Sequence, residues 1–320
     1  MTPRHPFTSW LASHFDHFVA LRNACGAKYV SQRRLLLALD RYLSQHAPGP
    51  PLRRETLQRY LASLDRLTPR ARDNAISVVW SALRHAQAHG AAIEPLPPRP
   101  AHPPAGWRQR PARILEPQEM SRLIRGARQL PPRGQLRAAT TATVIGLLSA
   151  TGIRIGEALA IDIGDLDPDD GILTIRSGKF GKRRALPLLS STTRALLRYL
   201  DHPARRVAKT ASAPLFVSCL RRRVAHATVT QGLYDASQIA GITQPRPRLH
   251  DLRHTFAVQR VAAWYREGRE VNRLLPALST YLGHVSVQNT RRYLTQNGVL
   301  LEQAASRFET STRALDEVRS

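Results

Sequence analysis

Hydrophobic residues recur every three to four positions in four stretches of the chain before residue 95. This spacing places apolar side chains on one face of an α-helix. The stretches are SWLASHFDHFVALR, SQRRLLLALDRYLSQH, RRETLQRYLASLD and RARDNAISVVWSALRHAQAHG. Ser9 and Ser31 stand at the start of the first two and are the expected N-caps, because a serine hydroxyl can accept hydrogen bonds from a first helical turn. The pattern predicts a small helical bundle.

A proline-rich segment follows these helices. Proline fixes φ and lacks an N–H donor, which excludes a helix or a central strand, and such segments tend to be extended and semi-rigid. The prolines concerned are Pro95, Pro97, Pro98, Pro100, Pro103, Pro104 and Pro111. We therefore predict a linker over residues 95–112 between a helical domain of residues 1–94 and a second domain of residues 113–320.

The pattern changes after the linker. ILTIRS at 172–177 and RRALPL at 183–188 are typical of two strands joined by the turn GKFGK, which predicts a β-hairpin. Helical spacing returns at about residues 190–200, 228–240, 252–265, 273–282 and 287–294. The predicted fold is mainly α with a small antiparallel β-sheet, so that the second domain is of the α+β class.

The net charge of the chain indicates the kind of molecule that it binds. The 320 residues include 48 lysines and arginines against 23 acidic residues, a formal charge of +25 that would repel itself without a polyanion nearby. Nucleic acid is the expected partner. Eight arginines of the first domain suit phosphate contacts, with a solvated basic face as the alternative. They are Arg33, Arg34, Arg53, Arg54, Arg59, Arg70, Arg72 and Arg84.

Other compositional features narrow the protein class. The most apolar stretch, TTATVIGLLSA at 140–150, is too short to cross a bilayer, and MTPRHPFTSW lacks the apolar region of a secretory signal. Cys25 and Cys219 are far apart, which predicts neither a disulfide framework nor a zinc site. We expect a protein of the cytoplasm, associated with the nucleoid, with no membrane partner.

The stretch RLHDLRHTFAVQRV at 248–261 carries His250, Arg253 and His254 on an otherwise apolar helix. Residues three and four apart share a helix face, so these side chains are expected to form one cationic cluster. A polar stripe facing solvent is the alternative reading.

A second arginine stands in SATGIRIGEALAI at 149–161. Gly152 can end one helix, and a new one can begin close to Arg154, where the free N–H groups and the helix dipole favour anions. Glu157 shares the face of Arg154 and could fix its guanidinium. The alternative is an ordinary ion pair on the surface.

Two further stretches carry candidate chemistry. Lys179 lies in the turn of the predicted hairpin and could be a proton donor or simply solvated. In YLGHVSVQNTRRYL, His284 and Tyr293 are nine positions apart and would face opposite ways on one helix. A stop at Gly283 and a new N-cap at Ser286 would let them converge. Otherwise they are a turn histidine and a half-buried aromatic.

The ordered set ATGIRIGEAL, GKFGKRRALPL, LHDLRHTFA and LGHVSVQNTRRYL closely resembles the tyrosine recombinases, the phage integrase and Xer-like site-specific DNA recombinases. The resemblance implies a helical, SAM-like core-binding domain followed by a catalytic domain. It implies a first catalytic arginine, a hairpin lysine, a middle histidine and arginine, a late histidine and a tyrosine nucleophile. In that order they are Arg154, Lys179, His250, Arg253, His284 and Tyr293.

The implied chemistry is physically coherent. A phenol of ordinary pKa near ~10 attacks well only if a base accepts its proton or cations stabilise the phenolate. Two arginine forks can hold the nonbridging oxygens of a phosphate and match the charge of its transition state. By resemblance, Tyr293 would form a 3′-phosphotyrosine while Lys179 protonates the departing 5′-hydroxyl. No metal, cofactor or ATP is expected.

The resemblance also implies double-stranded DNA as substrate and a homotetrameric synaptic complex, and it leaves open whether an accessory protein takes part. The tail LLEQAASRFETSTRAL at 300–315 is amphipathic. It is typical of a C-terminal helix that packs on its own domain or of one that packs on a neighbouring protomer. The segment AAWYREGREVNRLLPALST at 262–280 is longer than in the simple Xer-like pattern. Before the bundle we expect no further DNA-binding arm. The expected role is integration or excision for a mobile element; a catalytically silent DNA-binding protein and a type IB topoisomerase-like enzyme are the alternatives.

Overall fold

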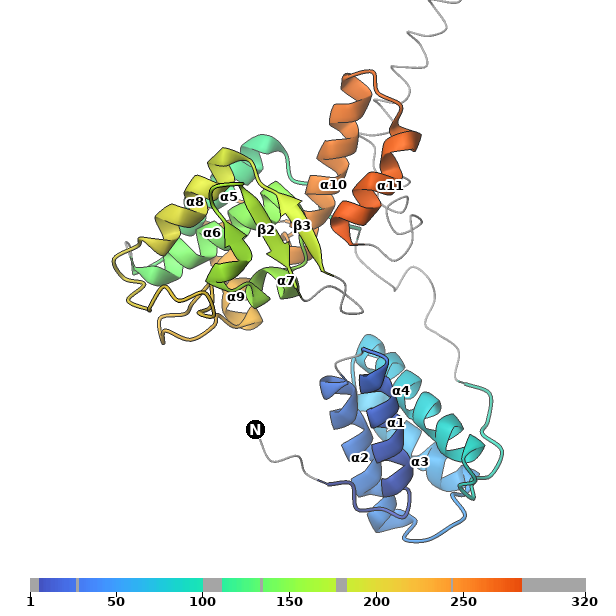
Figure 1. Cartoon of the computed structure of the whole chain (residues 1–320). Helices are drawn as coiled ribbons and strands as arrows, with labels where there is room; N and C mark the ends of the chain where they lie inside the picture. The colour runs from blue at the N-terminus through green and yellow to red at the C-terminus, as the bar shows by residue number, and fades with distance from the viewer. Residues whose placement is uncertain are drawn as a thin grey trace, which may run out of the picture. The chain divides into compact units, whose positions relative to one another are not determined.

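A computed structural model of the chain describes residues 6–26, 29–99, 111–132, 135–176, 183–242 and 244–283. The chain divides into two compact units, residues 1–110 and 111–320 (Figure 1). Each unit has its own hydrophobic core. Where the first unit ends and the second begins, the described residues 95–99 and 111–116 contain neither helix nor strand.

The first unit is a helical bundle, as its apolar spacing predicts. Its core includes Phe15, Phe18, Leu36, Val79 and Leu83, which come from three of the helices. The helices are α1 (Ala12–Ala24), α2 (Val30–His46), α3 (Arg54–Ser63) and α4 (Pro69–Ala88), with the short 3₁₀ helix η1 (Leu64–Arg66) after α3.

The two expected serine N-caps are wrong. α1 begins at Ala12 after Leu11, and Ser9 instead donates its hydroxyl to Oδ1 of the buried Asp40 on α2 at 2.6 Å. α2 begins at Val30, so Ser31 lies inside its first turn and donates to Gln32. Tertiary bonding and an earlier helix start account for the two errors. Thr68, by contrast, caps α4 with its side chain.

The second unit confirms a mainly α fold with a small antiparallel sheet (Figure 1). Its strands are β1 (Leu166–Asp167), β2 (Ile172–Ile175) and β3 (Arg184–Pro187), in the order β1-β2-β3. Ile172 pairs with Pro187 and Ile175 with Arg184, as expected for the predicted hairpin. Strand β1 was not predicted, because two residues are too few to display an alternating pattern.

The helices of this unit are α5 (Pro117–Arg128), α6 (Leu136–Thr151), α7 (Ile155–Ala160), α8 (Ser190–Leu200), α9 (His226–Ile239), α10 (Leu249–Arg266) and α11 (Val271–Leu282), with a 3₁₀ turn η3 (Ile163–Asp165). Helix α6 is largely buried and contacts α5, α7, α8, α9 and α10. No helix among the described residues is long and apolar enough to span a membrane.

Helix α10 contributes to two hydrophobic clusters. Leu249 and Leu252, in its first turns, pack into the main core. Val258 and Val261, farther along, form a smaller cluster with Leu275 on α11. Figure 1 shows α10 and α11 as neighbouring orange helices, and the chain contacts between them agree. The first turns of α10 and the end of α11 are therefore held close to the junction of α6 and α7.

Candidate active site

Arg154 occupies the junction between α6 and α7. Gly152 ends α6 with φ 62°, and Arg154 is the extended N-cap residue of α7. A Cβ at position 152 would lie 2.5 Å from Cδ1 of Phe256, so the turn needs glycine for both its φ and its close packing. The geometry confirms the predicted helix stop at Gly152.

Glu157 fixes Arg154, as the sequence predicts. The backbone N–H of Arg154 donates to Oε2 of Glu157 at 3.0 Å, and its Nη1 donates to Oε1 at 2.8 Å. The side chain of Arg154 keeps 30% of its surface exposed, whereas that of Glu157 keeps only 4%. A buried carboxylate therefore orients a guanidinium that solvent can still reach.

The same carboxylate also binds Arg184 at the start of β3. Nη2 of Arg184 donates to Oε2 of Glu157 at 2.7 Å, and Nη1 donates to Oε1 at 3.2 Å. Burial opposes ionisation of Glu157, but the hydrogen bonds and charge of Arg184 together with the bonds from Arg154 outweigh it, so the pKa of Glu157 lies below its ordinary value. One ionised carboxylate thus holds two guanidinium groups.

Arg253 is buried beside the same junction. It keeps only 1% of its surface exposed. Its Nη1 donates to the carbonyl of Gly152 at 2.8 Å, and its Nη2 donates to the carbonyl of Leu282 at 2.8 Å. Arg253 therefore ties the end of α6 to the end of α11.

Three arginines converge on the last carbonyls of α11. Arg184 Nε donates to Tyr281 at 3.0 Å, Arg253 Nη2 to Leu282 at 2.8 Å, and Arg154 Nη2 to Gly283 at 2.7 Å. A helix C-terminus has unsatisfied carbonyls and a partial negative charge, which guanidinium groups complement. The three donors therefore fix this helix end in place.

Gly283 ends α11 with φ 68°, which confirms the helix stop predicted there. A Cβ on this residue would lie 2.8 Å from Nη1 of Arg184 and 3.4 Å from Nη1 of Arg154. A larger residue would thus displace the guanidinium groups as well as strain the backbone. Gly283 is the last described residue of the chain.

The two histidines of α10, His250 and His254, are desolvated, and their pKa values are lowered. The rings of His250 and His254 lie 4.5 Å apart, centroid to centroid, and are nearly perpendicular. Burial and then the charge of Arg253 lower the pKa of His250, although Asp251 opposes the shift. Burial and His250 lower the pKa of His254 to about 4. Desolvation thus favours the neutral form of both rings in the free protein.

Asp251 organises the first turn of α10. It is fully buried and accepts from the backbone N–H of Arg248 at 2.9 Å and from Nη2 of Arg248 at 2.8 Å. Glu157 and Asp251 are thus both occupied by arginines, and neither presents ready oxygen ligands to a metal ion in this geometry.

Residues 113–298 match the model of the phage integrase family. The chain belongs to this family. The match confirms the resemblance to tyrosine recombinases that the four motifs carry, and it spans the unit in which the arginines converge.

Relatives and solved structures agree. The chain is 39% identical over 225 residues to a protein named integrase/recombinase y4rB from Sinorhizobium fredii, covering 66% of this chain and 72% of the relative. It is 31% identical to integrase/recombinase y4rE of the same organism, covering 94% and 96%. A lambda integrase tetramer bound to a Holliday junction shares the fold, with a TM-score of 0.59 and 18% identity over 88% of this chain and 76% of that one.

Within this phage integrase chain the structure brings together Arg154 and Arg253, and it places His250 one turn before Arg253 on α10. Lys179, His284 and Tyr293 lie outside the described residues, as do Ser286, the hairpin turn and the tail at 300–315. Arg184 was not among the predicted site residues. It lies within the predicted strand RRALPL, where nothing indicates that its partner is Glu157, 27 residues earlier.

Proposed function

We propose that this protein is a site-specific DNA recombinase that cleaves and rejoins strands through a covalent bond between DNA and Tyr293. The observation that carries the proposal is the meeting of Arg154 and Arg253 at the end of α11. His284 follows this helix end directly in the sequence. Membership of the phage integrase family supports the assignment.

Arg154 is proposed to bind the scissile phosphate. Its guanidinium is held by Glu157 and Gly283 and keeps part of its surface exposed. A fork that is fixed beforehand need not reorganise when charge develops on the nonbridging oxygens. Because Arg253 is buried in the free protein, we propose that its contact with the phosphate forms when DNA binds.

The proposed step conserves the phosphodiester. The phenolic oxygen of Tyr293 attacks phosphorus, a bond to the 3′-phosphate forms, and the bond from phosphorus to the 5′-oxygen breaks. His250, whose pKa burial lowers, can accept the phenolic proton, and Lys179 donates a proton to the departing 5′-oxygen. A second 5′-hydroxyl reverses the step and rejoins the strand. No ATP is consumed, and the protein itself supplies the cations that a metal would otherwise provide.

Double-stranded DNA and a homotetramer are the proposed partners. The formal charge of +25 suits a polyanion, and a protein of the same fold is a tetramer on a Holliday junction. The helical domain, taken as residues 1–94 with the linker 95–112, is proposed to add phosphate contacts. Its exposed arginines include Arg34, Arg53, Arg59 and Arg84. The two relatives are named integrase/recombinase, which supports a role in the integration or excision of a mobile element. The proposed place of action is the DNA of the nucleoid.

The test is the formation of a covalent protein–DNA adduct. Wild type, Tyr293→Phe and the control Tyr265→Phe are incubated in EDTA, without ATP, with supercoiled plasmids that carry fragments of the source genome. Adducts are then resolved on a denaturing gel. We expect adducts with wild type and Tyr265→Phe and none with Tyr293→Phe. Adducts that persist in Tyr293→Phe, or that need a divalent metal, would overturn the proposal.

A further inference from the structure

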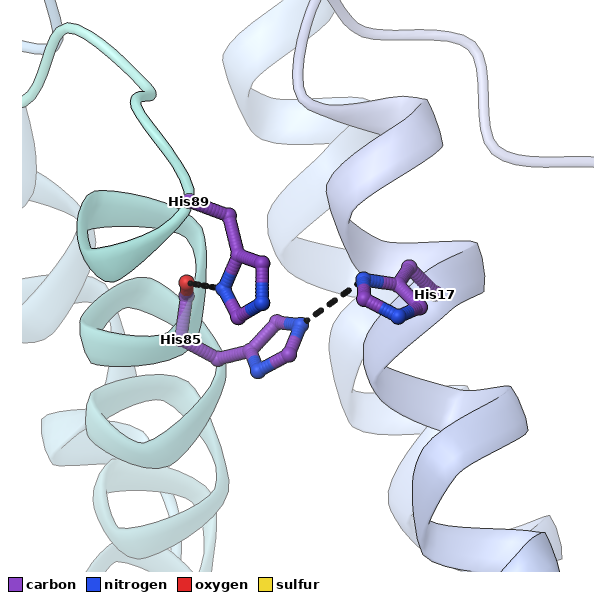
Figure 2. A group of neighbouring side chains, drawn as sticks. All are labelled: His17, His85 and His89. Carbon is purple, nitrogen blue, oxygen red and sulfur yellow. Dashed lines mark hydrogen bonds between the residues drawn. The ribbon is translucent and has the colours of Figure 1, made fainter.

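Three histidines converge on the surface of the first unit, in a place that the proposed chemistry does not use. His17 lies on α1, His85 on the last turn of α4, and His89 directly after that helix. Figure 2 shows the three rings turned toward one another between the two helices. One ring nitrogen from each residue lies within 4.8 Å of the other two.

The spacing suits metal coordination. Nε2 of His85 lies 3.3 Å from Nδ1 of His17. Two nitrogens bound to one ion at 2.0–2.1 Å with tetrahedral geometry would be about 3.3 Å apart. His85 and His89 are four positions apart, so they project from the same face of the end of α4. Small rotations of the rings would bring the third nitrogen to the same ion.

The contacts around the cluster orient its ligands. Nδ1 of His89 lies 2.8 Å from the carbonyl oxygen of His85, and since a carbonyl can only accept, this nitrogen carries the proton. The neutral ring then has its lone pair on Nε2. Metal-binding histidines commonly donate their other N–H to a backbone carbonyl in this way. The ring of His85 also packs against buried Phe18, with centroids 5.3 Å apart.

We propose that His17, His85 and His89 form a binding site for a divalent transition metal such as Zn²⁺. Imidazole nitrogens are ligands that Zn²⁺, Cu²⁺ and Ni²⁺ accept, whereas Mg²⁺ and Ca²⁺ prefer oxygen. His17 and His89 are exposed, so water can occupy a fourth position. This site is independent of the proposed recombinase chemistry.

The electrostatic surroundings are compatible with neutral ligands. Burial and then the neighbouring His89 and His17 lower the pKa of His85, and His14 and Arg22 act in the same direction. Neutral imidazole is the form that binds a metal. Arg22 adds a like charge that the coordination bonds have to overcome, which favours a strongly coordinating ion over a weakly held one.

Binding would join α1 to α4. The two helices already pack together in the core of the first unit, and the ion would add a bridge at their surface. A ligand that binds the folded state and not the unfolded one stabilises the protein by RT ln(1 + L/Kd), where L is the concentration of free ligand, so the melting temperature rises with that concentration. Metal binding would thus stabilise the helical unit.

The experiment titrates Zn²⁺ into the full-length protein against a chromophoric zinc indicator, and follows the visible absorption of Co²⁺ as a coordination signature. The variants are His17→Gln, His85→Gln and His89→Gln, and the matched control is His46→Gln, an exposed histidine of α2. Thermal melting of each variant without metal verifies that it folds.

We expect one Zn²⁺ bound by wild type and His46→Gln, with a tetrahedral Co²⁺ spectrum and a higher melting temperature in Zn²⁺. Each cluster variant should bind at least about tenfold more weakly, since even loss of an outer partner of a metal ligand costs about 10- to 100-fold. Unchanged affinity in variants that fold, or no Zn²⁺ bound by wild type, would overturn the proposal. Neither result depends on DNA cleavage.

Discussion

Arginine occupies two contrasting environments in this protein. In the second unit, Arg154, Arg184 and Arg253 each donate to a backbone carbonyl at the end of α11, and two of them share Glu157. In the first unit, Arg34 and Arg84 are exposed on helices of the bundle. Arginine thus fixes the position of a helix end in the second unit, whereas in the first unit it adds positive charge to the surface.

The energetic consequences differ as well. A buried guanidinium whose acceptors are also buried cannot be removed without leaving those acceptors unsatisfied. An exposed arginine is screened by water and salt, and contributes little to stability. Position and partners, rather than the count of charges, therefore decide what each arginine does.

The largest expected effect on stability is that of Arg253→Met. The substitution keeps much of the side-chain length but removes the donors to Gly152 and Leu282. We expect the free energy of unfolding to fall by about 3 kcal/mol, since each unsatisfied buried acceptor costs about 1–3 kcal/mol. Urea denaturation measures the change. The exposed Arg194→Met on α8 is the control, expected within about 0.5 kcal/mol of wild type. Equal losses of stability in both variants would contradict the difference between buried and exposed arginines.

Gly152→Ala is the next in size. Alanine at φ 62° is strained, and its Cβ would lie 2.5 Å from Phe256. We expect a loss of about 2–3 kcal/mol, from about 1 kcal/mol of strain together with overpacking. Gly90→Ala in the first unit has φ 83° but open space around it, so it should lose only the strain. Paired denaturation curves separate the two contributions, and a larger loss for Gly90→Ala would contradict the packing argument.

Glu157→Gln tests the shared carboxylate. The amide keeps the shape of the side chain but leaves Arg154 and Arg184 without their common counter-charge. We expect a loss of about 2 kcal/mol at neutral pH, below the range for a fully buried pair because Arg154 is partly exposed. No loss at neutral pH would show that the pairing is energetically idle.

This loss should depend on pH with a definite sign. Because the folded-state pKa of Glu157 is lowered, its ionisation stabilises the protein fully above the ordinary value of 4.5. The contribution disappears as pH falls through the lower, folded-state pKa. The gap between wild type and Glu157→Gln should therefore narrow in acid, as measured by urea denaturation at several pH values. A gap that widens in acid would contradict a lowered pKa.

The smallest expected effect on stability is that of Arg84→Met in the first unit. Its side chain is exposed, so the free energy of unfolding should change by less than about 0.5 kcal/mol. If Arg84 contacts phosphate, the negative slope of log affinity for DNA against log salt concentration should become less steep by about one. Filter binding at several salt concentrations measures the slope. An unchanged slope would remove Arg84 from the proposed DNA-binding face.

Local signals in the sequence predicted the helices and part of the site. Gly152 and Gly283 end helices because glycine tolerates a positive φ, and Arg154 meets Glu157 because residues three apart share a helix face. These interactions need only neighbouring residues. The spacing of His85 and His89 is equally visible in LRHAQAHG.

Contacts between distant segments were not predictable in the same way. The pairing of Arg184 with Glu157, the bond of Arg253 to Leu282, and the approach of His17 to His85 all depend on how elements pack. Ser9 is not the N-cap because α1 begins only at Ala12, and the Ser9 hydroxyl both donates to Asp40 on another helix and accepts from the N–H of Leu11. The lowered pKa of His250 follows from burial, which the apolar spacing indicates only roughly.

The most direct test of the proposed site compares a fixed guanidinium fork with charge alone. Arg154→Lys keeps the positive charge but loses the planar fork, and Arg194→Lys makes the same change at an exposed position of α8. The measurement is the single-turnover rate of covalent adduct formation on a DNA that wild type cleaves. We expect a rate at least about 100-fold lower for Arg154→Lys, comparable with the loss of one oxyanion donor, and an unchanged rate for Arg194→Lys. A rate for Arg154→Lys within a few-fold of wild type would contradict the proposed role of Arg154.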